Sequence, residues 1–205
     1  MDAALRSGIA LYNAGEHHAA HDPWEAEWLG LTTGTDDERL LHGLIQFTAA
    51  IHHARTRNWG GATGLAKSAA DYLAGLDSPS HGVDVAAPRR AMATLAADPE
   101  VIERRRPPPL RYEGRTLGLD DLDFECVAVV APALAAEHGY DEATVDRAVA
   151  YARKEVADGG RTLFTGPLFE FVTADEPHRA LVARRLGRHV DRRDREYDDV
   201  AGLFD

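Results

Sequence analysis

The sequence predicts an all-α protein, built as an antiparallel helical bundle with an additional, mostly helical C-terminal region. Apolar residues recur three and four positions apart along several segments, which is typical of helices that bury one face. Short turns that contain Asn and Gly separate these segments. With 205 residues, 44% of them hydrophobic, the chain is long enough to bury a core.

We expect the first helix over residues 2–12, where apolar side chains share one face. Asn13 and Gly15 end it, because both residue types tolerate the left-handed backbone conformation that follows many helices. A second helical segment is expected over residues 16–29, followed by a short loop.

The third helix has the clearest pattern in the sequence. Thr35 or Asp36 caps its start, acidic residues occupy its first turn, and Asn58 marks its end. An alanine-rich fourth helix follows over residues 62–76. Four helices joined by short turns predict an antiparallel bundle, so we place the first domain at residues 1–76.

Beyond the bundle, residues 77–119 have the composition of a linker with a short helix, a proline-rich stretch and a small hairpin. Residues 120–205 form the predicted C-terminal extension, which we expect to pack on the bundle. Within it, the pattern of residues 120–136 fits either a helix or a buried strand, whereas residues 141–158 and 175–195 predict amphipathic helices.

The formal net charge of −11 disfavours binding of the whole chain to nucleic acid or to anionic membranes. The sequence has no apolar run long enough to cross a membrane and begins without a secretory-signal pattern, so we expect a cytoplasmic location. Lysine occurs only at Lys67 and Lys154. This acidic, lysine-poor composition predicts a halophilic protein.

Six of the ten histidines lie in the second and third helical segments. On a continuous second helix, His17, His21 and Glu25 would lie four residues apart and share a face. Gln46 and His53 share a face of the third helix. If the two faces meet, imidazole and carboxylate groups converge, and this donor set suits one divalent ion such as zinc, nickel, iron or manganese. Three protein ligands would leave a position for water, whose pKa the metal would lower.

Pro23 gives the second segment a different interpretation. Because proline lacks the backbone N–H and clashes with the carbonyl four residues earlier, a helix would kink or begin there. Asp22 would then be the N-cap, and Glu25 would complete a capping box and serve the backbone. Trp24 and Trp28 are most simply core anchors, although they could also wall a pocket.

Several short blocks of the sequence occur in a fixed order: Asn13-Ala14-Gly15-Glu16, Ala20-His21-Asp22, Trp24-Glu25, Trp28, Gly43-Leu44-Ile45-Gln46 with Ala49-Ala50, His53, and Gly61-Ala62. Over about residues 5–76 they resemble domain-of-unknown-function family 309. The resemblance implies a small all-α bundle and carries the general label of a predicted metal-dependent hydrolase. Pro23 departs from the family pattern, which expects an unbroken helix at this point.

The first hypothesis for the function combines spacing with this resemblance. The residues that fall on family positions are His21, Glu25, Gln46 and His53. In a metal-dependent hydrolase, the two histidines would bind the metal, Glu25 would bind it or act as general base, and Gln46 would orient water or substrate. The pocket would also include Asp22, Trp24 and Trp28. The histidines set aside, because the family has other residues there, are His17, His18, His42 and His52.

The second hypothesis is a non-catalytic helical module for interaction or oligomerisation. The same polar residues would then form a buried hydrogen-bond network that fixes the register of the helices. The expected partner is a second copy of the chain or another protein. The sequence does not name a small-molecule substrate.

The C-terminal segment carries seven arginines over residues 179–195, with acidic residues between them. We expect a solvated, internally paired face here and no nucleic-acid site. Cys126, the one cysteine, excludes an internal disulfide and is expected to be a buried, inert thiol.

Overall fold

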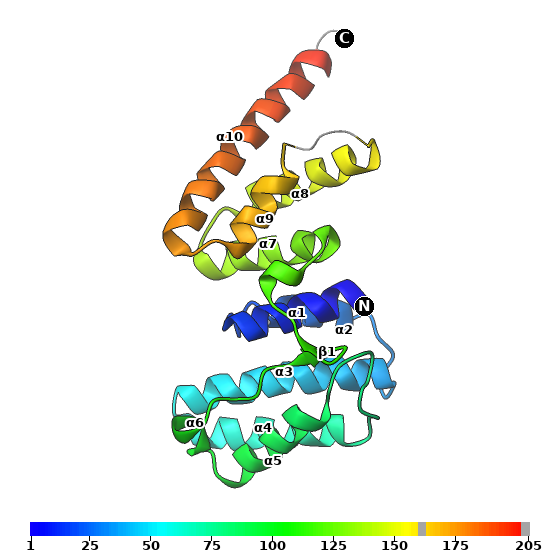
Figure 1. The fold of residues 1–205 in the computed structure, drawn as a ribbon, viewed down its shortest axis with the longest axis vertical. Coiled ribbons are helices and arrows are strands. Elements are labelled where there is room, and N and C mark those ends of the chain that lie inside the picture. The colour runs from blue at the N-terminus through cyan, green and yellow to red at the C-terminus, as the bar shows by residue number, and fades with distance from the viewer. Residues whose placement is uncertain (160–162, 202–205) are drawn as a thin grey trace. The chain divides into compact units, whose positions relative to one another are not determined.

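The computed structural model describes the backbone of residues 1–159 and 163–201, and the side chains up to residue 197. The chain divides into two compact units, Met1–Leu122 and Asp123–Asp205 (Figure 1). The expected all-α class is confirmed, since the described elements are helices apart from a pair of two-residue strands. Among the described residues, no helix combines the length and the apolar character needed to cross a membrane.

The N-terminal unit holds the bundle. Its elements are α1 (Asp2–Ala14), α2 (His21–Trp28), α3 (Asp36–Arg55), α4 (Trp59–Ala74), α5 (Ala86–Ala97), α6 (Val101–Arg104), β1 (Arg111–Tyr112), β2 (Arg115–Thr116) and the 3-10 helix η1 (Leu119–Asp121). Helix α2 packs against both α1 and α3, and α4 packs against both α3 and α5 (Figure 1). This chain of neighbours places the segment before α2 close to α3.

Two glycines allow the close approach of these helices. A Cβ atom at Gly8 of α1 would lie 2.2 Å from the ring of Trp24, which is completely buried. A Cβ atom at Gly43 of α3 would lie 2.7 Å from Leu73 of α4. Both contacts are too short for a real side chain, so the absence of a Cβ fixes the spacing of α1 to α2 and of α3 to α4.

Helix α2 differs from both sequence expectations. It begins at His21, after a turn in which the N–H of Ala20 bonds the carbonyl of Glu16. The continuous helix over residues 16–29 was therefore a wrong prediction. The alternative, with Asp22 as the N-cap and Glu25 in a capping box, was wrong as well, because the N-cap is Ala20. Pro23 lies in the first turn of α2, where the missing N–H would have no intrahelical partner in any case.

The predicted hairpin is confirmed by β1 and β2, which pair antiparallel. Glu113 and Gly114 connect them with positive φ values of 48° and 76°, as a two-residue hairpin turn requires. Asn13, at the end of α1, holds this segment in place. Its Nδ2 donates to the carbonyls of Leu110 and Leu117 at 2.9 and 2.8 Å, and its Oδ1 accepts from the N–H of Leu110 at 2.9 Å.

The C-terminal unit is helical in all its described elements. They are α7 (Phe124–His138), α8 (Glu142–Ala157), α9 (Thr165–Thr173) and α10 (Glu176–Ala201). The segment that fitted a helix or a strand is α7, whose first turn is capped by Asp123. Asp141 caps α8, as predicted, by accepting from the N–H of Thr144 at 3.3 Å.

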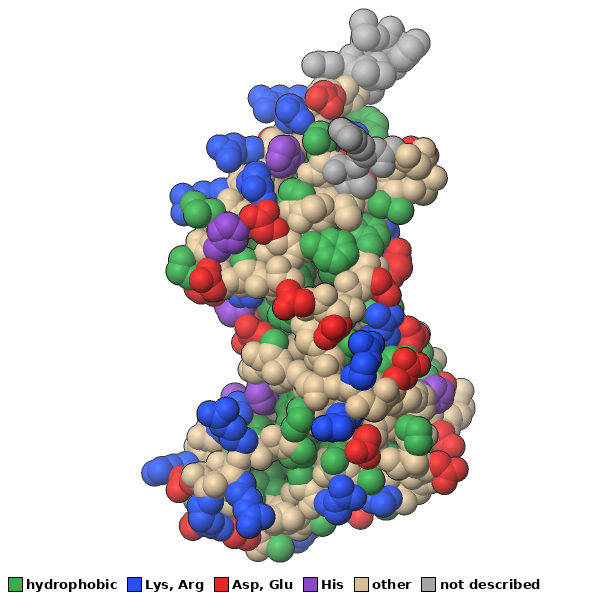
Figure 2. Space-filling model, in the orientation of Figure 1, with side chains coloured by type: hydrophobic (Ala, Val, Ile, Leu, Met, Phe, Trp, Pro, Cys, Tyr) green, Lys and Arg blue, Asp and Glu red, His purple; other side chains and the backbone are tan. Residues whose placement is uncertain are grey.

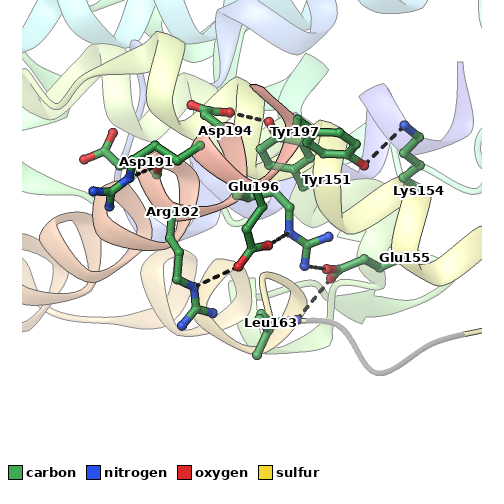
Figure 3. A network of polar contacts seen from close by, with 11 residues as sticks. Tyr151, Lys154, Glu155, Leu163, Asp191, Arg192, Asp194, Glu196 and Tyr197 are labelled. Atoms are coloured by element: carbon green, nitrogen blue, oxygen red, sulfur yellow. Dashed lines mark hydrogen bonds and ion pairs between the residues drawn. The ribbon is translucent and has the colours of Figure 1, made fainter. Parts of the chain in front are cut away.

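The arginines of α10 are largely paired within this unit, as expected for a structural face. Arg193 lies 2.6 Å from Glu155 of α8, and Arg192 lies 3.7 Å from Glu196 (Figure 3). Tyr151 of α8 donates a hydrogen bond to Asp194 (Figure 3). The Arg193–Glu155 and Tyr151–Asp194 contacts join α8 to α10 through side chains that are partly protected from solvent.

Candidate functional site

Five histidines of the N-terminal unit line one pocket of about 140 Å³, together with Ala49. We call it the histidine pocket; its histidines are His17, His18, His21, His52 and His53. They come from the turn before α2, from the first residue of α2 and from the last turns of α3. The structure therefore brings His21 and His53 to the same pocket, which the hydrolase hypothesis requires.

Three of these histidines had been set aside at the sequence level, namely His17, His18 and His52. The family positions did not identify these three pocket residues. His17 and His18 reach the pocket from the turn before α2, and His52 reaches it from the last turn of α3. The signal that could have found them is the pairing of adjacent histidines in two segments that pack together.

His21 is half-buried and is hydrogen-bonded through Nε2 to the hydroxyl of Thr48 on α3. That hydroxyl also lies 3.0 Å from the carbonyl of Ile45. Burial, and then the neighbouring histidines His18, His52 and His17, lower the pKa of His21 to about 4. The ring is therefore neutral near pH 7 and is a weak general base at that pH.

His53 is oriented by Asn58, the N-cap of α4. Asn58 Oδ1 accepts from the N–H of Gly61 at 3.1 Å, so Nδ2 is the atom that faces His53 Nδ1, at 2.8 Å. A neutral His53 consequently keeps its lone pair on Nδ1 and its proton on Nε2. A Cβ at Gly61 would lie 3.0 Å from His53 Nδ1, so glycine leaves room for this contact.

His17 has the opposite arrangement. Its Nδ1 lies 2.6 Å from the carbonyl of Gly15, so a neutral ring donates from Nδ1 and keeps its lone pair on Nε2. Burial lowers the pKa of His17, the bond to Gly15 opposes this shift, and the positive charge of Arg55 adds to the lowering. In their neutral forms, His53 therefore offers a donor at Nε2 and His17 an acceptor at Nε2.

The other predicted site residues lie elsewhere. Glu25 is exposed, Gln46 is half-buried, and neither lines the histidine pocket. Asp22 is exposed as well. Trp24 is fully buried and donates from Nε1 to the carbonyl of Leu5 at 3.2 Å, as a core anchor does.

Trp28 belongs to a polar cluster that sequence reasoning missed. Glu38 is only 6% exposed, and its carboxylate accepts from Trp28 Nε1 at 3.1 Å and from the N–H of Gly34 at 3.2 Å. His42 Nδ1 lies 3.2 Å from the same carboxylate. Burial alone would raise the pKa of Glu38, but these three hydrogen bonds outweigh it and lower the pKa. The available signal was the Glu-His spacing of four residues on α3.

The residues of the histidine pocket do not fit a metal centre in this arrangement. Within residues 1–159 and 163–197, no three His, Cys, Asp or Glu side chains are grouped so that they could hold a metal ion. His21 Nε2 is engaged by Thr48, and the contact from Asn58 leaves a proton on His53 Nε2. Glu25, the expected carboxylate ligand, does not reach the pocket.

The comparison with curated proteins finds no match to the chain. The comparison with protein families does find one, and it falls on the helices that build the histidine pocket. The resemblance to family 309 is thereby confirmed over residues 5–65, which match the family described as Domain of unknown function (DUF309).

Proposed function

We propose that the N-terminal unit is a binding module and that its histidine pocket takes a small oxyanion. The observation that supports this proposal is the composition of the pocket. Among the described residues, five imidazoles and one alanine line it and no carboxylate does. Glu16, next to His17, acts on the pocket from outside this lining. A lining of imidazoles repels an anion less than an acidic one would, whereas a cation site needs anionic or unprotonated donors in a common geometry.

A further feature favours an anion. Because Asn58 donates to Nδ1 of His53, the neutral form of this ring carries its proton on Nε2, and that N–H can donate to a bound oxyanion.

In this proposal, the tryptophans of the sequence motif and His21 stabilise the scaffold. Trp24 joins α2 to α1 through the Leu5 carbonyl, and Trp28 joins α2 to α3 through Glu38. His21 adds a second bond from α2 to α3 through Thr48. Hydrogen bonds of this kind fix helix register, which is the structural role expected of a non-catalytic module. Self-association of this module remains part of the proposal, and light scattering measures it.

The test is a titration of the full chain with inorganic phosphate, followed by calorimetry and by the imidazole signals in NMR spectra. We expect saturable binding at one site that His52→Ala, a change at an exposed pocket residue, weakens by about tenfold. His81→Ala is the matched control, because His81 is exposed outside the pocket and pairs with Asp37. Absence of saturable binding, or equal weakening by both changes, would contradict the proposal.

A metal-dependent hydrolase is the second candidate function. It is favoured by one observation, that His21 and His53 line the same pocket. Its test is the metal content of untagged protein, compared between the wild type and the double variant His21→Ala/His53→Ala. One equivalent of zinc, manganese, iron or nickel in the wild type alone would favour the hydrolase over the anion-binding module. Equal, substoichiometric metal in both would remove this candidate.

A further inference from the structure

A second concave site of the N-terminal unit lies between α5, α6 and the proline segment that follows α6. It is a groove of about 320 Å³, and we call it the α5 groove. Its floor is formed by three almost completely buried side chains, Ile51 of α3 and Met92 and Leu95 of α5. Ile102 and Pro108 contribute apolar walls. A hydrocarbon group is the kind of ligand that such a surface removes from water.

The polar part of the groove is cationic. Arg90, Arg105 and Arg106 line it, and none of the three makes an ion pair with a carboxylate in the described part of the chain. The adjacent Arg104, which does not line the groove, pairs with Asp98. Unpaired arginines beside an apolar groove are notable in a chain of net charge −11. Figure 2 shows hydrophobic side chains on the face of this unit that carries α5 and α6, with Lys and Arg side chains around them.

The nearby acidic residue of α6 does not neutralise these arginines. Glu103 lies 2.9 Å from Arg57, which is outside the groove. The guanidinium groups of the groove therefore keep their capacity for an external anion. Arginine pairs with carboxylate and phosphate through two parallel hydrogen bonds, which gives both affinity and orientation.

The proline wall of the groove is held by the bundle. The hydroxyl of Tyr12 on α1 donates to the carbonyl of Pro108 at 2.9 Å. Two residues later, the N–H of Leu110 donates to Asn13 Oδ1 at 2.9 Å. Because proline also restricts its own backbone, this wall is preformed, and ligand binding does not have to order it.

We propose that the α5 groove binds a small single-chain amphiphile, whose hydrocarbon part lies on Ile51, Met92 and Leu95 and whose oxyanion head pairs with the arginines of the rim. The volume of about 320 Å³ is at the lower end for small-molecule sites, so the tail is of medium length. The head is a carboxylate or a phosphate monoester, since the guanidinium group fits both. This site is independent of the histidine pocket, because no residue lines both.

The experiment uses the full chain labelled with ¹³C at the methionine methyl groups. The chain has two methionines, so Met92 reports the groove and Met1 is an internal control. Decanoate and decyl phosphate are titrated separately below their micelle concentrations, and decanol is titrated below its solubility limit. We expect decanoate or decyl phosphate to shift the Met92 signal saturably, and the tighter of the two identifies the head group. Decanol, which lacks the charge, should bind at least about tenfold more weakly.

Three variants decide the outcome. Arg105→Gln/Arg106→Gln, at two exposed positions, should weaken the anionic ligand by about tenfold or more and leave decanol unchanged. Arg104→Gln is the matched control and should bind as the wild type does. Ala91→Phe, which fills the groove, should abolish binding of all three compounds while the circular dichroism spectrum stays native. The proposal is overturned if no compound shifts Met92, if decanol binds as tightly as the anions, or if the arginine pair and Arg104 behave alike.

Discussion

The side-chain amide of Asn58 donates a hydrogen bond to the imidazole of His53, with 2.8 Å between Nδ2 and Nδ1. The same amide caps α4 through its oxygen, which accepts from the N–H of Gly61 at 3.1 Å. One residue therefore starts a helix and fixes which nitrogen of a pocket histidine carries the proton.

This relationship predicts that two changes at Asn58 affect different properties, the tautomer of His53 and the stability of the fold. Asn58→Asp keeps the cap, but it places a carboxylate oxygen against His53 Nδ1, which must then carry a proton. We expect the His53 tautomer to switch, with stability changed by less than about 1 kcal/mol. Asn58→Ala should lose the cap and about 1 kcal/mol of stability. Nitrogen-15 NMR of the imidazole and urea unfolding measure the two effects, and an unchanged tautomer in Asn58→Asp would contradict the assignment.

Gly8 and Gly64 form a matched pair of helix glycines. A Cβ at Gly8 would overlap the buried ring of Trp24, whereas a Cβ at Gly64 of α4 meets nothing within 4 Å. Gly8→Ala should reduce the free energy of unfolding by about 2 kcal/mol or more, through overpacking. Gly64→Ala should increase it by about 0.5–1 kcal/mol, because alanine has the better helix propensity. Chemical denaturation of both variants checks the sign, and a stable Gly8→Ala would contradict the described packing of α1 on α2.

The lowered pKa of His21 predicts acid sensitivity. The folded ring takes up its proton near pH 4, whereas the unfolded residue does so near its ordinary value of 6.5. Between these values the unfolded state binds more protons, so stability is complete above pH 6.5 and is lost as the pH falls toward 4. After allowance for solvent at this half-buried ring, the loss is about 2 kcal/mol.

Unfolding in urea at several pH values measures this slope. His21→Gln keeps an amide that can bond Thr48 but does not titrate, so it should flatten the dependence between pH 4 and 6.5. His81→Gln, at an exposed ion pair with Asp37 outside the pocket, is the control and should leave the His21 contribution in place. Equal slopes in the wild type and in His21→Gln would show that another group is responsible.

The two glutamates Glu25 and Glu38 should respond differently to the same change. Glu38→Gln places an amide nitrogen among donors from Trp28, Gly34 and His42, and we expect a cost of about 1–3 kcal/mol. Glu25 is exposed, so Glu25→Gln should change stability by less than about 0.5 kcal/mol. Thermal unfolding measures both losses of stability. A larger loss for Glu25→Gln than for Glu38→Gln would support the prediction from the sequence that Glu25 belongs to a buried site.

The acidic composition predicts a dependence on salt. A net charge of −11 makes the folded state repel itself in dilute buffer, and salt screens this repulsion. We expect the midpoint of thermal unfolding to rise between dilute buffer and molar potassium chloride. An unchanged midpoint would contradict the halophilic interpretation of the composition.

The helices could be predicted from the sequence because capping residues and apolar spacing specify them locally. Thr35 caps α3 by accepting from the N–H of Glu38 at 3.3 Å, and Asp141 caps α8 in the same way. The hairpin could be predicted because Glu113-Gly114 can adopt the positive φ values of a tight turn. The predicted packing of residues 120–205 on the bundle remains a prediction.

The histidine pocket could be predicted only in part. His21 and His53 were placed together correctly by assuming that α2 and α3 meet. The histidine pocket also includes His17, His18 and His52, because a turn precedes α2 and lies against α3. Pro23 requires the helix to begin near it, but no local pattern specifies the path of the turn. Glu25 lies on the same helix as His21, four residues later, but it is exposed and does not line the pocket, so the spacing alone did not place it correctly.

The sequence by itself determined the all-α class, the family of residues 5–65 and the positions of most helix ends, since caps, breakers and apolar spacing act over a few residues. The tertiary structure decided which side chains share a pocket, which carboxylate is buried with Trp28, and which arginines of the α5 groove make no ion pair with another described residue. These properties arise where segments distant in sequence pack against one another, and packing is a long-range outcome that local periodicity does not encode.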